Sequence, residues 1–331
     1  MTATTFLRTT AGRFCPADYR YPVATFARMP DFEAETIYVV GGLYGNRLAL
    51  DAVERMAEQE NGKVEVVYNG DFHWFDTDPH GFSAVQSRVL ACRALRGNVE
   101  TEIARADGEA DVGCGCAYPD TIADAVVERS NTIFSRLRQT AVNISGSREQ
   151  LAALPMHLVV QLGGCRVGIV HGDAESLAGW RFGHEALDDD STLPWLDAVG
   201  TESNIGVFCS SHTCLPAMRE FAFHDARLVI ANNGAAGLPN FAGTHFGLIT
   251  RMSIRPAPRP ALYGVRVADA FIDAMPVEFD HARWLRSFES NWPAGSPAHM
   301  SYHSRIVNGP DFSLTSAMPV SHRRVTANGH D

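Results

Sequence analysis

The sequence lacks any apolar run long enough to cross a membrane, because none approaches the roughly 18 to 20 apolar residues that a spanning helix needs. Residues Met1 to Arg13 also lack the apolar core of a signal peptide. Positive charge is scarce as well, since the net charge is -10, and binding to phosphate backbones requires a basic face. We therefore expect a soluble, cytoplasmic protein without a membrane or nucleic-acid partner.

Cysteines at zinc-finger spacing are missing too. The seven cysteines are an odd number scattered over 331 residues, which is more typical of reduced thiols than of a disulfide framework. Cys114 and Cys116 are separated by a single residue, a spacing too close for an easy disulfide. The sequence therefore predicts free thiols.

The chain is long and apolar enough to bury one large core, since 45% of its 331 residues are hydrophobic. Residues 1–35 show no sustained hydrophobic period and are predicted to form an N-terminal arm. The main domain is expected at 36–255, because the run Pro256-Ala257-Pro258-Arg259-Pro260 marks a boundary. Residues 256–331 are expected to be a C-terminal extension that packs on this domain and ends in a loose tail from Pro310.

Apolar runs of strand length alternate with amphipathic segments, which favours an α/β fold. The predicted strands include Ile37–Val40, Val64–Tyr68, Cys165–Val170, Ile205–Cys209 and Leu262–Val267, and the predicted helices include Leu48–Glu58, Ser83–Leu95 and Val277–Phe288. The glycine-rich turn 41–46 does not fit a nucleotide-binding loop. It has neither the spacing of the dinucleotide fingerprint nor the Gly-Lys-Ser/Thr ending of a P-loop.

Polar residues that can bind a metal follow several of the apolar runs. Asp71 comes just after a predicted strand, and Asn98, His171 and His212 each sit just past another apolar run. Loops that leave the carboxyl ends of buried strands converge on one crevice in open α/β sheets. The four residues together therefore predict a metal site.

Taken in order, these loops resemble the motifs of the calcineurin-like metallophosphoesterases. The family pattern is Asp-x-His-Gly-Asn, Gly-Asp, Gly-Asn-His-Asp/Glu, His-Gly and Gly-His-Thr-His-x-Pro. The corresponding segments here are Gly42-Leu43-Tyr44-Gly45-Asn46, Gly70-Asp71, Gly97-Asn98-Val99-Glu100, His171-Gly172 and Ser211-His212-Thr213-Cys214-Leu215-Pro216. The resemblance implies an α/β/β/α sandwich of two packed mixed sheets flanked by helices. It also implies a hydrolase that uses a metal-activated water on a phosphate ester of a small molecule.

The sequence departs from the family at one of its two metal positions. In the family, one metal is held by the Asp and His of the first motif, the last His and a bridging Asp; here those positions are Gly42, Tyr44, Cys214 and Asp71. The ligands of the other metal correspond to Asp71, Asn98, His171 and His212, which all remain. The resemblance therefore implies one divalent ion per chain, and this ligand set suits Mn, Fe or Zn.

The catalytic histidine of the family falls on Val99, which cannot transfer a proton. Glu100 or His73 could orient the attacking water instead, and Arg305 is a candidate anion contact. An alternative is a scaffold with altered function. It would be either a ligand-binding pseudoenzyme or a protein with thiol chemistry through Cys214, Cys114 or Cys116.

Overall fold

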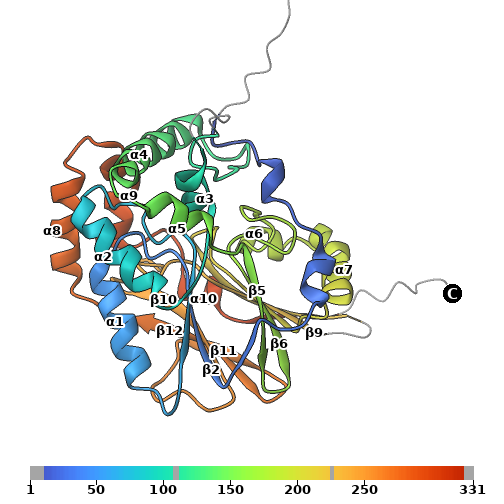
Figure 1. Ribbon diagram of the computed structural model, residues 1–331. Helices are drawn as coiled ribbons and strands as arrows, with labels where there is room; N and C mark the ends of the chain where they lie inside the picture. Colours follow the sequence, from blue (N-terminus) through green and yellow to red (C-terminus); the bar gives the residue numbers. More distant parts are fainter. Residues whose placement is uncertain (1–10, 107–111, 224–226, 324–331) are drawn as a thin grey trace, which may run out of the picture.

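The computed structural model describes residues 11–106, 112–223 and 227–323. Within these ranges, two mixed β-sheets pack face to face at the centre of the molecule (Figure 1). One sheet has the strand order β1 (Phe32–Ala34), β5 (His157–Leu162), β6 (Cys165–Val170), β7 (Val207–Ser210), β9 (Arg227–Asn233), β8 (Pro216–Ala222) and β13 (Val320–Arg323). The other has the order β11 (Tyr263–Val267), β12 (Ala270–Val277), β10 (Gly247–Ser253), β2 (Thr36–Val40), β3 (Glu65–Asn69) and β4 (Arg93–Leu95).

Helices cover the outer faces of both sheets. The sheet that contains β2 is covered by α1 (Arg47–Glu58), α2 (Pro79–Leu90), α3 (Asn98–Ala104), α4 (Asp124–Val142), α5 (Ser147–Ala152), α8 (His281–Asn291) and α9 (Pro297–Asn308). The sheet that contains β6 is covered by α6 (His184–Leu187), α7 (Leu193–Ser203) and the 3-10 helix η2 (Val23–Ala27). In the described ranges, no helix has the length and apolarity needed to cross a membrane.

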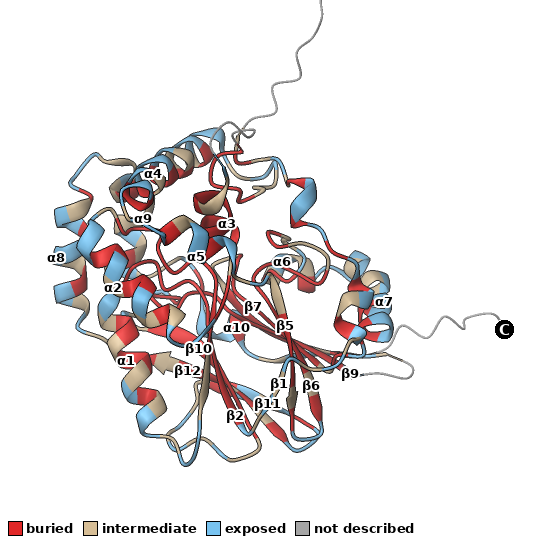
Figure 2. Cartoon of the chain, viewed as in Figure 1, coloured by how far each residue is buried: buried red, intermediate tan, exposed pale blue. Residues whose placement is uncertain are grey.

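The side-chain alternation of the strands produces separate hydrophobic cores. On β2, Ile37 and Val39 enter the core between the two sheets, whereas Tyr38 and Val40 enter the core beneath the helices. This follows from the two-residue period of a strand. Buried residues accordingly concentrate on the central strands and on the inner sides of the helices (Figure 2). The predicted α/β/β/α sandwich is confirmed.

The arrangement of parallel strands gathers the motif loops at one edge. β2 pairs with β3 in parallel, and β6 pairs with β7 in parallel. The loops that leave their carboxyl ends therefore meet at the same edge of the sandwich. The first of these loops ends at Asn46, which caps α1 by accepting from the backbone N–H groups of Leu48 and Ala49.

The N-terminal arm and the C-terminal extension both contribute strands to the sandwich. In the N-terminal arm, β1 pairs in parallel with β5. The last described strand, β13, pairs in parallel with β8. The prediction of a loose tail from Pro310 is therefore wrong for residues 310–323, which contain α10 (Leu314–Ala317) and β13. Arg219 holds this segment by donating hydrogen bonds to the carbonyls of Ser316 and Met318. Residues 324–331 lie outside the described ranges.

Two predicted helices have different bounds in the structure. The helix expected at Ser83–Leu95 begins at Pro79 and ends at Leu90, because Arg93–Leu95 pairs with β3 as the edge strand β4. The helix expected at Val277–Phe288 begins only at His281, where the Asp280 side chain accepts from the N–H of Arg283. Short edge strands and capping residues thus shifted both boundaries.

Candidate metal centre

Four predicted ligands meet at the edge where the motif loops gather. Asp71 follows β3, Asn98 begins α3, His171 follows β6, and His212 lies two residues after β7. His171 Nε2 lies 3.0 Å from Asn98 Oδ1 and 3.2 Å from His212 Nδ1. It also lies 3.4 Å from Asp71 Oδ1. The four side chains therefore converge on one point, two from each sheet.

These separations suit a shared metal ion. Two ligand atoms at about 2.0–2.2 Å from an ion lie about 2.8–3.6 Å apart when the angle between them is octahedral or tetrahedral. One possible ligand atom from each of Asp71, His171 and His212 lies within 4.8 Å of the others. Among the residues that the structure describes, this is the only such cluster of three or more His, Cys, Asp or Glu side chains.

Backbone carbonyls fix the orientation of the three neutral ligands. His171 Nδ1 donates to the carbonyl of Asn69 at 2.9 Å, and His212 Nε2 donates to the carbonyl of Cys116 at 3.1 Å. Asn98 Nδ2 donates to the carbonyl of Cys114 at 2.8 Å. A donor hydrogen bond on one side of each group directs its remaining nitrogen or oxygen toward the common point, as in protein metal sites.

The electrostatics of the cluster favour a positive charge at this point. Burial lowers the pKa of His171, but the Asp71 carboxylate, the Asn69 carbonyl and Glu100 together raise it, and the net shift is upward. Burial opposes the charge on Asp71, but His171, His212 and the backbone N–H of Val99 together lower the pKa of this carboxyl group. Burial and then the nearby His171 lower the pKa of His212 to about 3. His212 is therefore a neutral acceptor that can bind a metal ion.

Glu100 fastens two of the ligand loops to each other. Its carboxylate accepts from the backbone N–H groups of Asp71, Phe72 and Gly97 at 2.8, 3.0 and 2.9 Å. The side chain is fully buried, and burial raises its pKa. The sequence suggested that Glu100 could orient a catalytic water, but these three hydrogen bonds direct both of its oxygens to the backbone.

His73, the second predicted water-orienting residue, lies in the loop that follows Asp71. Its Nδ1 lies 2.9 Å from Asp76 Oδ2, and its ring stacks on Phe82 with centroids 3.7 Å apart. The side chain is fully buried, and Nε2 has no hydrogen-bond partner among the described residues. His73 therefore packs in the core beside the Asp71 loop.

The other metal position of the resembled family is filled rather than open. Tyr44 Oη lies 2.8 Å from Cys214 Sγ. A Cβ atom on Gly42 would lie 3.0 Å from Cζ of the Tyr44 ring, so this ring occupies the space that a residue-42 side chain would need. Burial raises the pKa of both the Tyr44 hydroxyl and the Cys214 thiol. Both groups are therefore protonated and poor ligands.

Cys114 and Cys116 form a disulfide in the structure, with Cα atoms 5.4 Å apart. The prediction of free thiols is therefore wrong for this pair, although the other five cysteines are free as expected. Gly115 between them has a φ of +65°, a conformation that glycine adopts readily. This left-handed turn brings the two flanking side chains to the same side of the loop.

Arg305 of α9 contacts the loops that surround the centre. Its guanidinium donates to the carbonyl of Pro239 at 3.0 Å and to that of Cys214 at 2.8 Å. The sequence marked Arg305 as a candidate anion contact. In the structure these two hydrogen bonds of Arg305 connect the C-terminal extension to the Cys214 loop.

A small aromatic cavity adjoins the four ligands. It is lined by Tyr44, Asp71, Trp74, Val99, Cys116, Tyr118, Trp180, His212, Cys214 and Tyr302. This lining includes no arginine or lysine among the described residues. The space open to the centres of water-sized molecules is about 40 Å³. That holds a few waters or a hydrated ion, whereas pockets for drug-sized ligands measure about 300–1,000 Å³.

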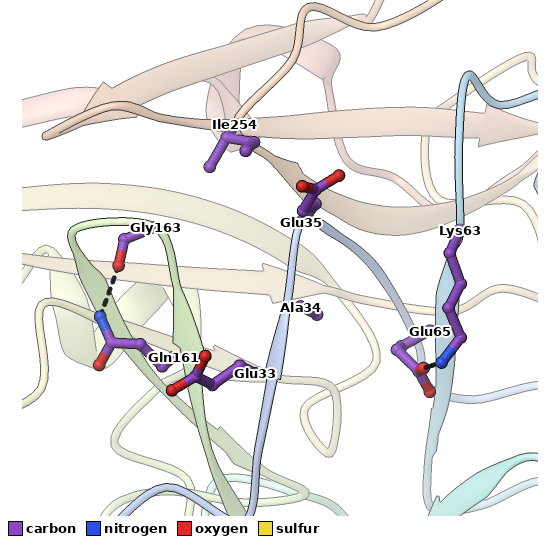
Figure 3. A pocket seen from close by; sticks show the side chains of 8 residues that line it. All are labelled: Glu33, Ala34, Glu35, Lys63, Glu65, Gln161, Gly163 and Ile254. Atoms are coloured by element: carbon purple, nitrogen blue, oxygen red, sulfur yellow. Dashed lines mark hydrogen bonds and ion pairs between the residues drawn. The ribbon is translucent and has the colours of Figure 1, made fainter.

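A larger groove lies at the opposite edge of the sandwich. It has a volume of about 410 Å³ and is lined by residues that include Glu33, Glu35, Lys63 and Glu65 (Figure 3). Lys63, the one lysine of the sequence, pairs with Glu65 at 2.5 Å. The groove lies near the amino-terminal ends of β2 and β3. The candidate metal centre lies near their carboxyl ends, so the two sites are separate.

Solved structures share this fold. The chain is similar to a hypothetical protein of Pyrococcus horikoshii OT3 at 16% identity, with 83% of this chain and 99% of that chain covered and a TM-score of 0.56. It is also similar to a metallophosphoesterase of Sphaerobacter thermophilus at 15% identity, with 83% of this chain and 100% of that chain covered and a TM-score of 0.52. The sequence itself matches no family model and no curated protein.

The two-sheet topology and these neighbours show the class of fold: it is the fold of the calcineurin-like metallophosphoesterases. On this fold, the chain has a candidate site for a divalent metal in the cluster of Asp71, His171 and His212. The similarity, at 15–16% identity, extends to the fold.

Proposed function

We propose that this protein is a hydrolase that uses one divalent metal ion on a phosphate ester of a small molecule. The observation that carries the proposal is the convergence of Asn98 Oδ1, His212 Nδ1 and Asp71 Oδ1 on His171 Nε2, at 3.0, 3.2 and 3.4 Å. These residues would hold the ion, and the donor set suits Mn, Fe or Zn. When bound, the ion supplies a Lewis acid and lowers the pKa of a coordinated water.

The residues around the cavity have separate roles in this proposal. Glu100 positions the loops of Asp71 and Asn98, so it acts through these ligands. The aromatic walls exclude bulk water. Burial raises the pKa of Tyr118 to about 12 and also raises the pKa of Tyr302, so both hydroxyls remain protonated at neutral pH. Both side chains line the cavity together with Val99, the position where the resembled family has its catalytic histidine.

The test combines metal analysis with an activity assay. Protein purified without chelator should contain one equivalent of Mn, Fe or Zn per chain, and it should hydrolyse a generic phosphomonoester or diester when Mn is supplied. His212→Ala should abolish both properties, whereas the control variant His303→Ala, on α9, should retain them. Turnover that persists in His212→Ala would refute the assignment of the activity to this centre.

A second candidate is a metal-binding scaffold without hydrolytic activity. The observation that favours it is the filling of the neighbouring metal position by Tyr44 and Cys214, beside a cavity of only about 40 Å³. Stoichiometric metal with no turnover of any ester would support this candidate. Thiol catalysis through Cys214 has less support, because burial raises the pKa of this thiol and the thiolate is the reactive form.

A further inference from the structure

The Cys114–Cys116 disulfide lies against the metal centre but has no role in the proposed hydrolysis. Cys116 lines the same cavity as Asp71 and His212, and its Sγ lies 3.4 Å from Asn98 Nδ2. The carbonyl of Cys116 accepts from His212 Nε2. Cys116 thus contacts two of the four ligands, Asn98 and His212, through Nδ2 and Nε2, the atoms that face away from the point where the ligands converge.

The two sulfur atoms differ in their surroundings. Cys116 is 7% exposed and lines the cavity, whereas Cys114 is fully buried and is absent from the described lining. The third sulfur near the cavity, that of Cys214, contacts the Tyr44 hydroxyl at 2.8 Å and the His212 carbonyl at 3.3 Å. Cys116 is therefore the sulfur that reduction would free beside the ligands.

We propose that reduction of this disulfide adds Cys116 as a fifth protein ligand of the metal, so that the centre has two ligand sets that depend on redox state. The proposal rests on the proposed metal site. A sulfur in a disulfide carries no negative charge and is a poor ligand, whereas a thiolate binds borderline ions such as Zn, Fe and Co strongly. The cavity has room for a few waters, which a thiolate could replace.

The redox step is a thiol–disulfide exchange with a dithiol. A thiolate of the reductant attacks Cys116 Sγ and breaks the bond to Cys114 Sγ, and the second reductant thiol then closes the cyclic disulfide of the reductant. Two electrons pass to the protein, and the two protons of the reductant end on Cys114 and Cys116. When Cys116 binds the ion, its proton passes to solvent.

Cobalt spectroscopy tests the proposal, because Co²⁺ bound by a thiolate has a near-ultraviolet charge-transfer band that nitrogen and oxygen ligands do not produce. The oxidised protein loaded with Co²⁺ should show visible d–d bands without the charge-transfer band. Treatment with dithiothreitol, followed by its removal under argon, should produce the band. In the same samples, thiols titrated after denaturation should rise from the five free cysteines to all seven.

Matched variants identify the sulfur. Cys114→Ser should show the charge-transfer band without any reductant, because Cys116 is then permanently free. Cys116→Ser should lack the band in both states, whereas Cys214→Ser and the control Cys92→Ser should behave as the unmodified protein does. A band that survives in Cys116→Ser, or reduction to seven thiols without a band, would overturn the proposal. Absence of d–d bands in the oxidised protein would instead show that the metal site itself is wrong.

Discussion

At the scale of single residues, Glu100 holds two ligand loops in position without lining the cavity. Its two oxygens accept three backbone N–H groups, and these belong to the loops that carry Asp71 and Asn98. A carboxylate suits this place because both of its oxygens are acceptors, whereas an amide has only one. The geometry of the ligands therefore depends on a residue that contacts none of their metal-binding atoms.

We expect Glu100→Gln to weaken both the fold and the metal site. The new amide would place its NH₂ group against a backbone N–H, which should lower the free energy of unfolding by about 1–3 kcal/mol. Metal affinity should fall about 10–100-fold, as for other residues that orient ligands. Denaturant unfolding and metal titration measure the two effects, and the exposed Glu185→Gln is the control. Unchanged affinity would show that the ligand loops keep their positions without this carboxylate.

A second residue-scale prediction concerns Cys214→His. This change restores one ligand type of the resembled family, but the Tyr44 ring still fills the neighbouring space and Gly42 offers no side chain. We therefore expect metal analysis to find one ion per chain, as in the unmodified protein. Two tightly bound ions in this variant would mean that Tyr44 moves aside and that two-metal hydrolysis is accessible.

At the scale of elements, helix α9 is tied to the centre through Arg305. The guanidinium bonds with the carbonyls of Cys214 and Pro239, and Cys214 has a left-handed φ of +62°. Loss of these bonds leaves two carbonyls without their charged donor and frees a loop held in an uncommon conformation. The C-terminal extension thus stabilises the wall of the cavity.

Arg305→Met should therefore loosen the Cys214 loop. We expect a loss of about 1–3 kcal/mol in the free energy of unfolding and faster alkylation of Cys214 in the native protein, measured by mass spectrometry. The exposed Arg286→Met on α8 provides the comparison, and its labelling rate should equal that of the unmodified protein. Equal rates in both variants would show that other contacts hold this loop.

The sequence predicted elements best where an apolar run coincides with a strand. Cys165–Val170 was predicted with the bounds that the structure has, because it is almost continuously apolar and ends at His171. β4 was missed because its three residues follow an amphipathic helix directly, and only pairing with β3 makes them a strand. The disulfide was missed because the turn at Gly115 depends on backbone conformation, which residue spacing does not reveal.

At the scale of the whole molecule, the candidate centre connects the two sheets. Asp71 and Asn98 follow strands of one sheet, and His171 and His212 follow strands of the other. An ion bound by all four would bridge the sandwich at this edge.

The order of the four ligands along the chain could be predicted from the motifs. The aromatic wall of the cavity could not, because its residues come from separate segments without a shared pattern; they are Trp74, Tyr118, Trp180 and Tyr302.

Metal binding should consequently stabilise the entire fold. At a free metal concentration of 100 times Kd, a ligand that binds only the folded state adds about 2.7 kcal/mol to its stability. We expect the melting temperature to rise with added Mn or Zn and to fall with chelator, as followed by circular dichroism. His171→Ala should show no such dependence on metal. A metal-dependent rise in that variant would place the stabilising ion elsewhere.

The position of Lys63 has a practical consequence for handling the protein. Lys63 is the one lysine of the sequence, its side chain is 85% exposed, and it precedes β3, whereas Asp71 follows that strand. Amine-directed reagents should therefore couple only here and at the α-amino group. A biotin or fluorophore on Lys63 would sit at the far edge of the sandwich and should leave metal uptake unchanged. Attached to a sensor chip through this side chain, the molecule would present its cavity edge to the solution.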